Sequence, residues 1–145
     1  MEKISEFRGK YYFLSNFYFS PLAYEGIKYL NVEAAFQAQK CESKLEKLQF
    51  AKLNPTDAKH RGRQVKLRSD WEEVKFKIME DLVREKFSQN PELAIKLLET
   101  GDAIIEEGNY WHDTIWGVCN GEGENHLGKI LMKVREELKN NGNKF

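Results

Sequence analysis

Apolar residues recur every three or four positions in the last part of the chain, which is the spacing of one face of an α-helix. This stripe consists of Leu127, Ile130, Leu131, Val134 and Leu138. A second stripe follows the sequence SDWE at 69–72, and its members are Trp71, Val74, Ile78, Leu82 and Phe87. SDWE matches the capping box S-x-x-E, so we expect a long helix that is capped by Ser69. Both patterns predict amphipathic helices that pack against a core.

Four shorter helices are also predicted, three of them between residue 31 and the stripe that begins at Trp71, and one between the two stripes. They cover Val32 to about Cys41, SKLEKLQFAKL at 43–53, PTDAKHRGR at 55–63 and NPELAIKLLETG at 90–101. Asn31 precedes the first as a cap, and proline stands at the start of the last two, where its missing N–H does no harm. Gly101 is a typical stop signal.

Strands are predicted mainly before residue 31. The segments YYFLSNFYFS at 11–20 and LAYEGIKYL at 22–30 are rich in aromatic and branched residues, and Pro21 and Glu25-Gly26 punctuate them. Residues 103–106 form a further candidate strand. We therefore predict an α+β fold: a helix-rich single domain over 1–140 with a small antiparallel sheet, followed by a frayed tail at 141–145.

Charge and composition limit the possible functions. The chain has 23 basic and 23 acidic residues, so its formal net charge is zero. This argues against binding nucleic acid through the overall field of the protein, although a local basic pocket remains open. We expect no signal peptide and no membrane partner, and the isolated Cys41 and Cys119 fit a reduced, cytoplasmic protein.

One helix face carries an unusual set of polar residues. Glu33, Gln37 and Lys40 stand at i, i+4 and i+7, so they share one side of the helix at 32–41. On residue types alone, a solvated helix face explains this arrangement better than a site does. The alternative is that the face lines a pocket.

The segment FLSNFY at 13–18 interrupts an aromatic run with Ser15 and Asn16. A turn or bulge accounts for this as well as a function does. In the functional interpretation, Asn16 binds a ligand and the aromatic rings form the pocket wall.

The basic segment AKHRGRQVKLRSDW at 58–71 is a third candidate. A solvated basic run is its usual explanation. Alternatively, Arg63 or Arg68 binds a phosphate, Trp71 provides a stacking face, and Gly62 allows the backbone to approach closely.

The fourth candidate is TGDAIIEEGNYWHDTIWG at 100–117, where Asp102, Glu106 and Asp113 lie among large rings that include Trp116. Carboxylates against aromatic walls often have the altered proton affinity that acid–base chemistry needs. The alternative is that Asp102 and Asp113 cap local turns.

Several common sites are not indicated. The sequence contains no G-x-G-x-x-G or G-x-x-x-x-G-K-[ST] phosphate loop and no G-x-S-x-G elbow. Its histidines, His60, His112 and His126, are scattered. We therefore expect neither a metal nor a cofactor.

Taken in order, these segments resemble one family, the YbiA-like family, which is also called NADAR for its association with NAD and ADP-ribose. The matching pieces are FLSNFY (13–18), YLNVEAAFQAQK (29–40), AKHRGRQV (58–65), RSDW (68–71), KFSQNPELAIKLLETGDAIIEEG (86–108), WHDTIWG (111–117) and NHLGKILMKVRE (125–136). Each is weak alone, but the ordered set covers nearly the whole chain. The resemblance implies a YbiA-like fold.

The resemblance also implies an activity. Members of the family are N-glycosidases, and one branch cleaves ribosylamino-pyrimidine 5′-phosphate intermediates of riboflavin biosynthesis into ribose 5-phosphate and the free base. Another branch removes ADP-ribose from guanine, so ADP-ribosylated nucleic acid is an alternative partner. A third possibility is a non-catalytic module that binds NAD or ADP-ribose. The neutral net charge favours the small phosphorylated N-riboside.

Matching the motifs residue by residue assigns roles within this sequence. The expected catalytic residues are Glu33, Lys40 and Asp113. The expected substrate-binding residues are Asn16, Gln37, Arg63, Arg68, Trp71, Asp102, Glu106 and Trp116. Either Glu33 or Asp113 is expected to supply negative charge or act as the base, and Lys40 either donates a hydrogen bond as a cation or forms a Schiff base with C1′.

Overall fold

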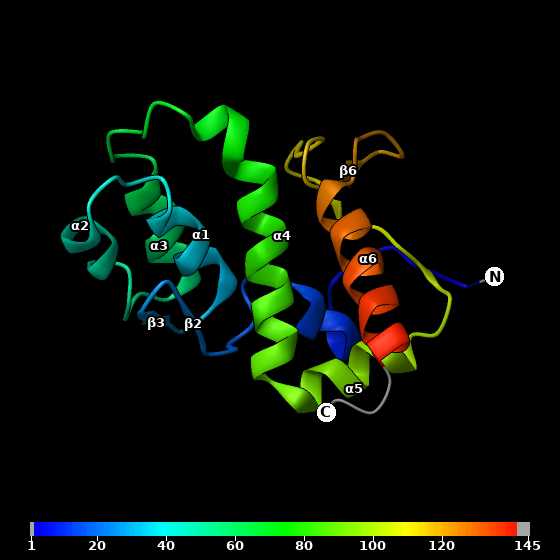
Figure 1. Cartoon of the computed structure of the whole chain (residues 1–145). Coiled ribbons are helices and arrows are strands. Elements are labelled where there is room, and N and C mark those ends of the chain that lie inside the picture. The colour runs from blue at the N-terminus through cyan, green and yellow to red at the C-terminus, as the bar shows by residue number, and fades with distance from the viewer. Residues whose placement is uncertain (1, 142–145) are drawn as a thin grey trace. The chain divides into compact units, whose positions relative to one another are not determined.

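The computed structural model describes residues 2–141 (Figure 1). Contacts in space divide these residues into two compact units. One consists of residues 16–90, and the other of residues 2–15 and 91–141. Within the described residues, helices predominate and the strands form three two-stranded sheets. This confirms the predicted helix-rich α+β fold. The single domain over 1–140 stays a prediction.

The unit formed by residues 16–90 begins with a hairpin. Strands β2 (Leu22–Tyr24) and β3 (Ile27–Tyr29) pair antiparallel, as predicted. The two residues that join them, Glu25 and Gly26, have φ angles of 49° and 84°. Left-handed conformations at both positions are what a two-residue hairpin turn needs to match the twist of its strands.

Four helices follow the hairpin: α1 (Val32–Ala38), α2 (Lys44–Leu48), α3 (Pro55–Gly62) and α4 (Trp71–Gln89). Helix α1 packs against the other three helices and against β3. Every residue of α1 is therefore buried, its polar residues included. A helix that is buried all round must satisfy its polar groups within the protein.

The other unit contains two short parallel sheets and two α-helices. Strand β1 (Lys3–Ile4) pairs with β4 (Ile104–Ile105), and β5 (Gly108–Asn109) pairs with β6 (Val118–Cys119). The 3₁₀ helix η1 (Gly9–Leu14) lies near the N-terminus of the chain. Helix α6 (His126–Asn141) packs against α5 (Pro91–Glu99) and against β4.

Two local predictions were wrong. The segment 11–20 is not a strand, because Gly9–Leu14 forms the 3₁₀ helix and buries the consecutive residues Phe13 and Leu14. Ser69 does not cap α4, because the helix begins one residue later, with Asp70 at the N-cap position. Asp70 makes no side-chain cap bond; its carboxylate binds Arg68 instead.

The predicted strand at 103–106 is confirmed as β4. The frayed tail was predicted from 141, but Asn141 is the last residue of α6. The rest of that predicted tail lies outside the described residues.

Candidate functional site

The polar face of α1 is buried and internally hydrogen-bonded. Glu33 is 9% exposed and Gln37 is 6% exposed, so this face is not solvated. The Gln37 amide nitrogen, Nε2, donates a hydrogen bond of 2.6 Å to Glu33 Oε2. The helix spacing brings them together, since residues four apart lie one above the other on a helix. A buried carboxylate held by an amide donor is a group whose charge can act in a low-dielectric site.

Lys40 follows the last turn of α1 and is half-buried. Its Nζ donates to the carbonyl oxygen of Gly62 at 3.4 Å, and its backbone carbonyl accepts the backbone N–H of Arg68 at 2.9 Å. Burial lowers the pKa of the Lys40 ammonium below its usual value, Glu33 opposes the shift, and the positive charge of Arg63 adds to it. The amine therefore loses its proton more easily than an exposed lysine does.

Asn16 meets the start of α1 through its backbone. Its carbonyl oxygen accepts the Glu33 N–H at 3.1 Å, which satisfies one of the N–H groups that a helix leaves unpaired in its first turn. Its side-chain amide donates a weak contact of 3.6 Å to Met79 Sδ. The structure thus places Asn16 beside Glu33.

Trp71 packs inside this unit. Its ring lies 5.0 Å from that of Phe36, centroid to centroid, at a tilt of 53°, and the residue is 5% exposed. Because Phe36 is on α1 and Trp71 begins α4, the pair joins the two helices. One face of the indole is already used in this packing.

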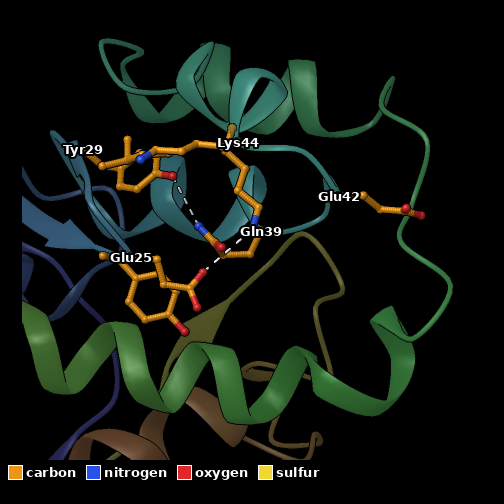
Figure 2. A pocket seen from close by; sticks show the side chains of 8 residues that line it. Glu25, Tyr29, Gln39, Glu42 and Lys44 are labelled. Carbon is orange, nitrogen blue, oxygen red and sulfur yellow. Dashed lines mark hydrogen bonds and ion pairs between the residues drawn. The ribbon is translucent and has the colours of Figure 1, made fainter.

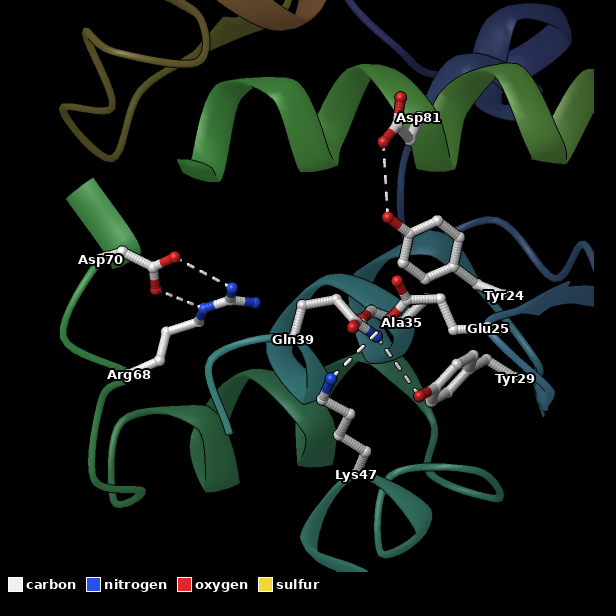
Figure 3. A network of polar contacts seen from close by, with 9 residues as sticks. All are labelled: Tyr24, Glu25, Tyr29, Ala35, Gln39, Lys47, Arg68, Asp70 and Asp81. Carbon is white, nitrogen blue, oxygen red and sulfur yellow. Dashed lines mark hydrogen bonds and ion pairs between the residues drawn. The ribbon is translucent and has the colours of Figure 1, made fainter. Parts of the chain in front are cut away.

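The two candidate phosphate ligands differ in their environment. Arg63 is exposed at the C-cap of α3. Arg68 binds Asp70 through two hydrogen bonds of 2.6 and 3.0 Å, shown in Figure 3. These bonds raise the pKa of the Arg68 guanidinium and lower that of the Asp70 carboxyl. A guanidinium has five N–H donors, so Arg68 keeps donors for a further anion.

The remaining predicted residues belong to the unit of residues 2–15 and 91–141. Asp113 Oδ1 accepts the backbone N–H of Ile115 at 3.2 Å and that of Trp116 at 2.9 Å, so Asp113 caps a local turn. The Trp116 ring meets the His126 ring edge-on at a centroid distance of 6.2 Å.

Asp102 and Glu106 interact electrostatically with basic residues of this unit. Glu106 Oε1 lies 3.2 Å from Lys3 Nζ, which adds an ion pair to the pairing of β1 with β4. Asp102 is exposed after α5. Its charge opposes the lowering of the Arg135 pKa that burial causes.

A small polar pocket, which the sequence did not indicate, lies in the unit of residues 16–90 (Figure 2). It has a volume of about 210 Å³, and its lining includes Tyr24, Tyr29, Gln39, Glu25, Glu42 and Lys44. Gln39 Nε2 donates to the Tyr29 hydroxyl at 3.3 Å and to the Ala35 carbonyl at 3.0 Å. These residues come from the hairpin, from α1 and from the segment that enters α2, so no single motif predicts them.

Burial raises the pKa of both Tyr24 and Tyr29 to about 12, so the tyrosines of this pocket stay protonated well above neutral pH. The Tyr24 hydroxyl donates to Asp81 Oδ2 at 3.4 Å, as Figure 3 shows. Glu25 pairs with Lys47 at 3.8 Å. Since carboxylates and amines balance around the pocket, it favours neither cations nor anions.

No group of three or more histidine, cysteine or acidic residues within residues 2–141 has the geometry to hold a metal ion. Nor does any helix in that range combine the length and apolarity that crossing a bilayer demands.

Comparison with known proteins gives a consistent family. Residues 5–139 match the model of the NADAR domain family. A riboflavin biosynthesis protein of Vibrio vulnificus is 40% identical over 132 residues, which cover 87% of this chain but only 35% of that protein. The present chain thus spans a minor part of that relative.

Two further similarities extend over most of both proteins. The N-glycosidase YbiA of Shigella flexneri is 37% identical over 128 residues, which cover 86% of this chain and 79% of that protein. The NMR structure of the E. coli protein YbiA matches with a TM-score of 0.86 at 33% identity, and the match covers 100% of this chain and 90% of that one.

Proposed function

The chain belongs to the NADAR domain family, and we propose that it is an N-glycosidase that hydrolyses the C1′–N bond of ribosylamino-pyrimidine 5′-phosphates. The products are ribose 5-phosphate and the free base. The names of two relatives, an N-glycosidase and a riboflavin biosynthesis protein, support this class of reaction and substrate. The observation within the chain that carries the proposal is the buried Glu33–Gln37 pair on α1 together with Lys40, which lies just beyond the end of that helix and has a lowered pKa.

The reaction needs negative charge close to C1′. Cleavage of an N-glycosidic bond passes through an oxocarbenium-like transition state, which a nearby carboxylate stabilises. Glu33 suits this role because its carboxylate is buried, where electrostatic interactions are stronger than in water. Asp113 is the second proposed acid. Water adds its oxygen to C1′, and a proton goes to the departing nitrogen.

Lys40 can act in one of two ways. As a neutral amine it attacks C1′ of the ring-opened substrate, expels the amino group of the base, and forms an imine that water hydrolyses to the free sugar and the regenerated lysine. As an ammonium it donates a hydrogen bond to the leaving group. The lowered pKa of Lys40 increases its neutral fraction and so supports the first role.

The substrate's phosphate is proposed to bind the arginines. Arg63 is exposed, and Arg68 keeps N–H donors beyond those that Asp70 uses. A guanidinium can bind phosphate through two parallel hydrogen bonds. Asn16, Gln37, Trp71, Asp102, Glu106 and Trp116 complete the proposed set of substrate-binding residues.

Chromatographic detection of ribose 5-phosphate tests the proposal directly. The protein is incubated with 5-amino-6-ribosylaminouracil 5′-phosphate, alongside Lys40→Ala and a control, Lys52→Ala, which changes an exposed lysine. We expect release by the wild type and the control, and none by Lys40→Ala.

No release by a folded wild type would contradict the proposed substrate. The assay would then use ADP-ribosylated guanine in an oligonucleotide, and release of ADP-ribose would establish the other glycosidase activity. Calorimetric binding of ADP-ribose without turnover of either substrate would identify a binding module instead.

A further inference from the structure

Gly62 lies where α3 meets the side chain of Gln37 on α1. It is the last residue of α3, it is buried, and its backbone is not in the left-handed region that only glycine favours. Glycine is therefore needed here because a side chain would not fit, and not because of its backbone conformation. A Cβ at this position would lie 2.6 Å from Gln37 Cδ and 3.1 Å from Gln37 Cβ, and closer still to Gln37 Oε1.

This close approach fixes the orientation of the Gln37 amide. The amide nitrogen faces Glu33, and the amide oxygen faces Gly62. That oxygen is buried and has no hydrogen-bond partner among the described residues. Reversing the amide would set its oxygen against the Glu33 carboxylate and leave the nitrogen without an acceptor, so the observed orientation is the favourable one.

A buried acceptor without a partner lowers stability, because it has lost its hydrogen bond to water and gained none in the protein. An apolar residue at position 37 would avoid this cost, but it would also lose the 2.6 Å bond to Glu33. Gln37 therefore leaves its amide oxygen unpaired within the described part of the chain, while its amide nitrogen binds the Glu33 carboxylate. Gly62 makes this possible, because any larger residue would displace the amide.

The same residue also contacts the amine. Lys40 Nζ donates to the Gly62 carbonyl at 3.4 Å. The last carbonyls of a helix have no partner within it and carry the negative end of the helix dipole. The carbonyl of Gly62, at the C-terminus of α3, is thus an acceptor for Lys40. When one Nζ hydrogen bonds to it, the other hydrogens or the lone pair of Nζ point away from α3.

We infer that Gly62 is a positioning residue of the proposed reaction, because it lets α3 reach α1 so that Gln37 holds Glu33 and the Gly62 carbonyl holds Lys40. This inference rests on the proposed function, since it assigns Gly62 a role through Glu33 and Lys40. The sequence suggested Gly62 as a point where backbone approaches an anion, whereas the structure fills that space with the side chain of Gln37.

A double-mutant cycle tests the inference. The variants are Gly62→Ala, Gln37→Ala and the double variant, with His60→Ala as a control at an exposed position of α3. We expect Gly62→Ala to lower kcat by about 10- to 100-fold, the loss typical of a misplaced catalytic group, while KM changes little. The double variant should lose little beyond Gln37→Ala, because the methyl group no longer meets the amide and only the 3.1 Å approach to Cβ of residue 37 remains.

The pH profile separates positioning from a general loss of structure. A carboxylate that loses a hydrogen-bond donor takes up a proton more readily, so the acidic limb of kcat should move to higher pH in Gly62→Ala and Gln37→Ala. A fall in kcat without this movement would overturn the inference. So would a double variant whose loss equals the product of the two single losses.

The same cycle stays informative if Gly62→Ala folds poorly. Gln37→Ala removes the two closest contacts of the new methyl group, so Gly62→Ala should lower kcat and Tm much less in the Gln37→Ala background than in the wild type. Equal losses in the two backgrounds would overturn the inference.

A measurement without substrate distinguishes failure of the inference from failure of the proposed function. Hydrogen exchange of the Gln37 side-chain amide, followed by NMR, should be slow in the wild type and at least about tenfold faster in Gly62→Ala, since the bond to Glu33 is lost. Unchanged exchange overturns the inference whether or not the enzyme turns over. Faster exchange in a protein without turnover would overturn the proposed function while confirming that Gly62 holds Gln37 on Glu33.

Discussion

A buried carboxylate is expensive to keep, and Glu33 remains buried at 9% exposure with an amide donor 2.6 Å away. The Glu33→Gln variant tests whether its charge serves the reaction. We expect kcat to fall by about 10²- to 10⁴-fold, because the variant keeps the shape of the side chain but loses the negative charge and the ability to act as a base. Tm should stay near the wild-type value or rise, since a buried charge has been removed.

The control for this variant is Glu72→Gln, an exposed change on α4. It should leave kcat unaltered. Full activity in Glu33→Gln would remove Glu33 from the mechanism and leave Asp113 as the proposed acid.

The two roles of Lys40 predict opposite responses to pH. Burial lowers the pKa of its ammonium below 10.5. If the neutral amine attacks C1′, kcat rises as the pH rises through this lowered pKa. If the ammonium donates a proton or hydrogen bond, kcat falls over the same range. We expect the rising profile.

Chemical trapping checks the same role by a separate route. Incubation with ribose 5-phosphate and cyanoborohydride should reduce an imine on Lys40 to a stable adduct, which peptide mass spectrometry would locate. Labelling of Lys52 to the same extent would show that the trapping is unspecific. A falling pH profile together with no adduct at Lys40 would establish the ammonium role.

At the scale of the element, the position of α1 depends on Asn31. Its Oδ1 accepts the Ala34 N–H at 2.7 Å as the helix cap, and its Nδ2 donates to the Leu53 carbonyl at 3.2 Å. Asn54 caps α3 through a bond of 2.8 Å from the Asp57 N–H, but it is exposed. The two caps therefore differ in burial and in their long-range contact.

We expect Asn31→Ala to lower the free energy of unfolding by about 2–3 kcal/mol, because it removes a cap and leaves the partly buried Leu53 carbonyl without this donor. Asn54→Ala should cost about 1 kcal/mol, the usual value for a cap. Urea denaturation of both variants measures the difference. Equal losses would show that the contact with Leu53 adds nothing.

The elements that could be predicted are those whose signals are local. The cap Asn31, the proline at the start of α3 and the stripe of α6 each lie within a few residues, and the corresponding helices form where the sequence indicates. Strands of two residues have no period, so β1, β5 and β6 could not be found in this way. An aromatic run is equally compatible with a 3₁₀ helix, which is why residues 11–20 were mistaken for a strand.

The candidate site shows the same division. The shared face of Glu33 and Gln37 follows from helix periodicity and could be predicted, whereas Lys40 lies in the turn beyond the end of α1. Its burial, the contact of Gln37 with Gly62 and the pairing of Arg68 with Asp70 depend on how α1, α3 and α4 pack. Such packing brings together positions that are distant in the sequence, so the spacing of residues along the chain does not predict it.

At the scale of the whole molecule, stability should depend on pH through one buried lysine of α4. Lys86 is 1% exposed, and its ammonium lies 5.3 Å from the centroid of the Phe87 ring and 6.0 Å from that of Tyr18. Burial lowers its pKa from 10.5 to about 7. A cation over an aromatic ring is stabilised, but by less than full hydration would provide.

The sign of the effect follows from proton binding. Between pH 7 and 10.5 the unfolded chain keeps the Lys86 proton while the folded chain has lost it, so the unfolded state binds more protons and stability rises with pH. The slope due to this group approaches about 1.4 kcal/mol per pH unit. Below pH 7 both states are protonated, and the full cost of burying the charge is present. Lys40 contributes in the same direction, because its pKa is also lowered.

Urea unfolding at pH 7, 8 and 9 of the wild type, Lys86→Met and the exposed control Lys52→Met tests this account. The window stays below pH 10 because Tyr24 and Tyr29, whose pKa burial raises to about 12, reduce stability at higher pH. We expect the free energy of unfolding to rise with pH in the wild type and the control, and much less in Lys86→Met. The comparison uses the slope and not the absolute stability, since methionine also removes the polar contacts of Lys86. Equal slopes in all three proteins would mean that the folded chain keeps the Lys86 proton throughout this range, and that α4 accommodates the charge.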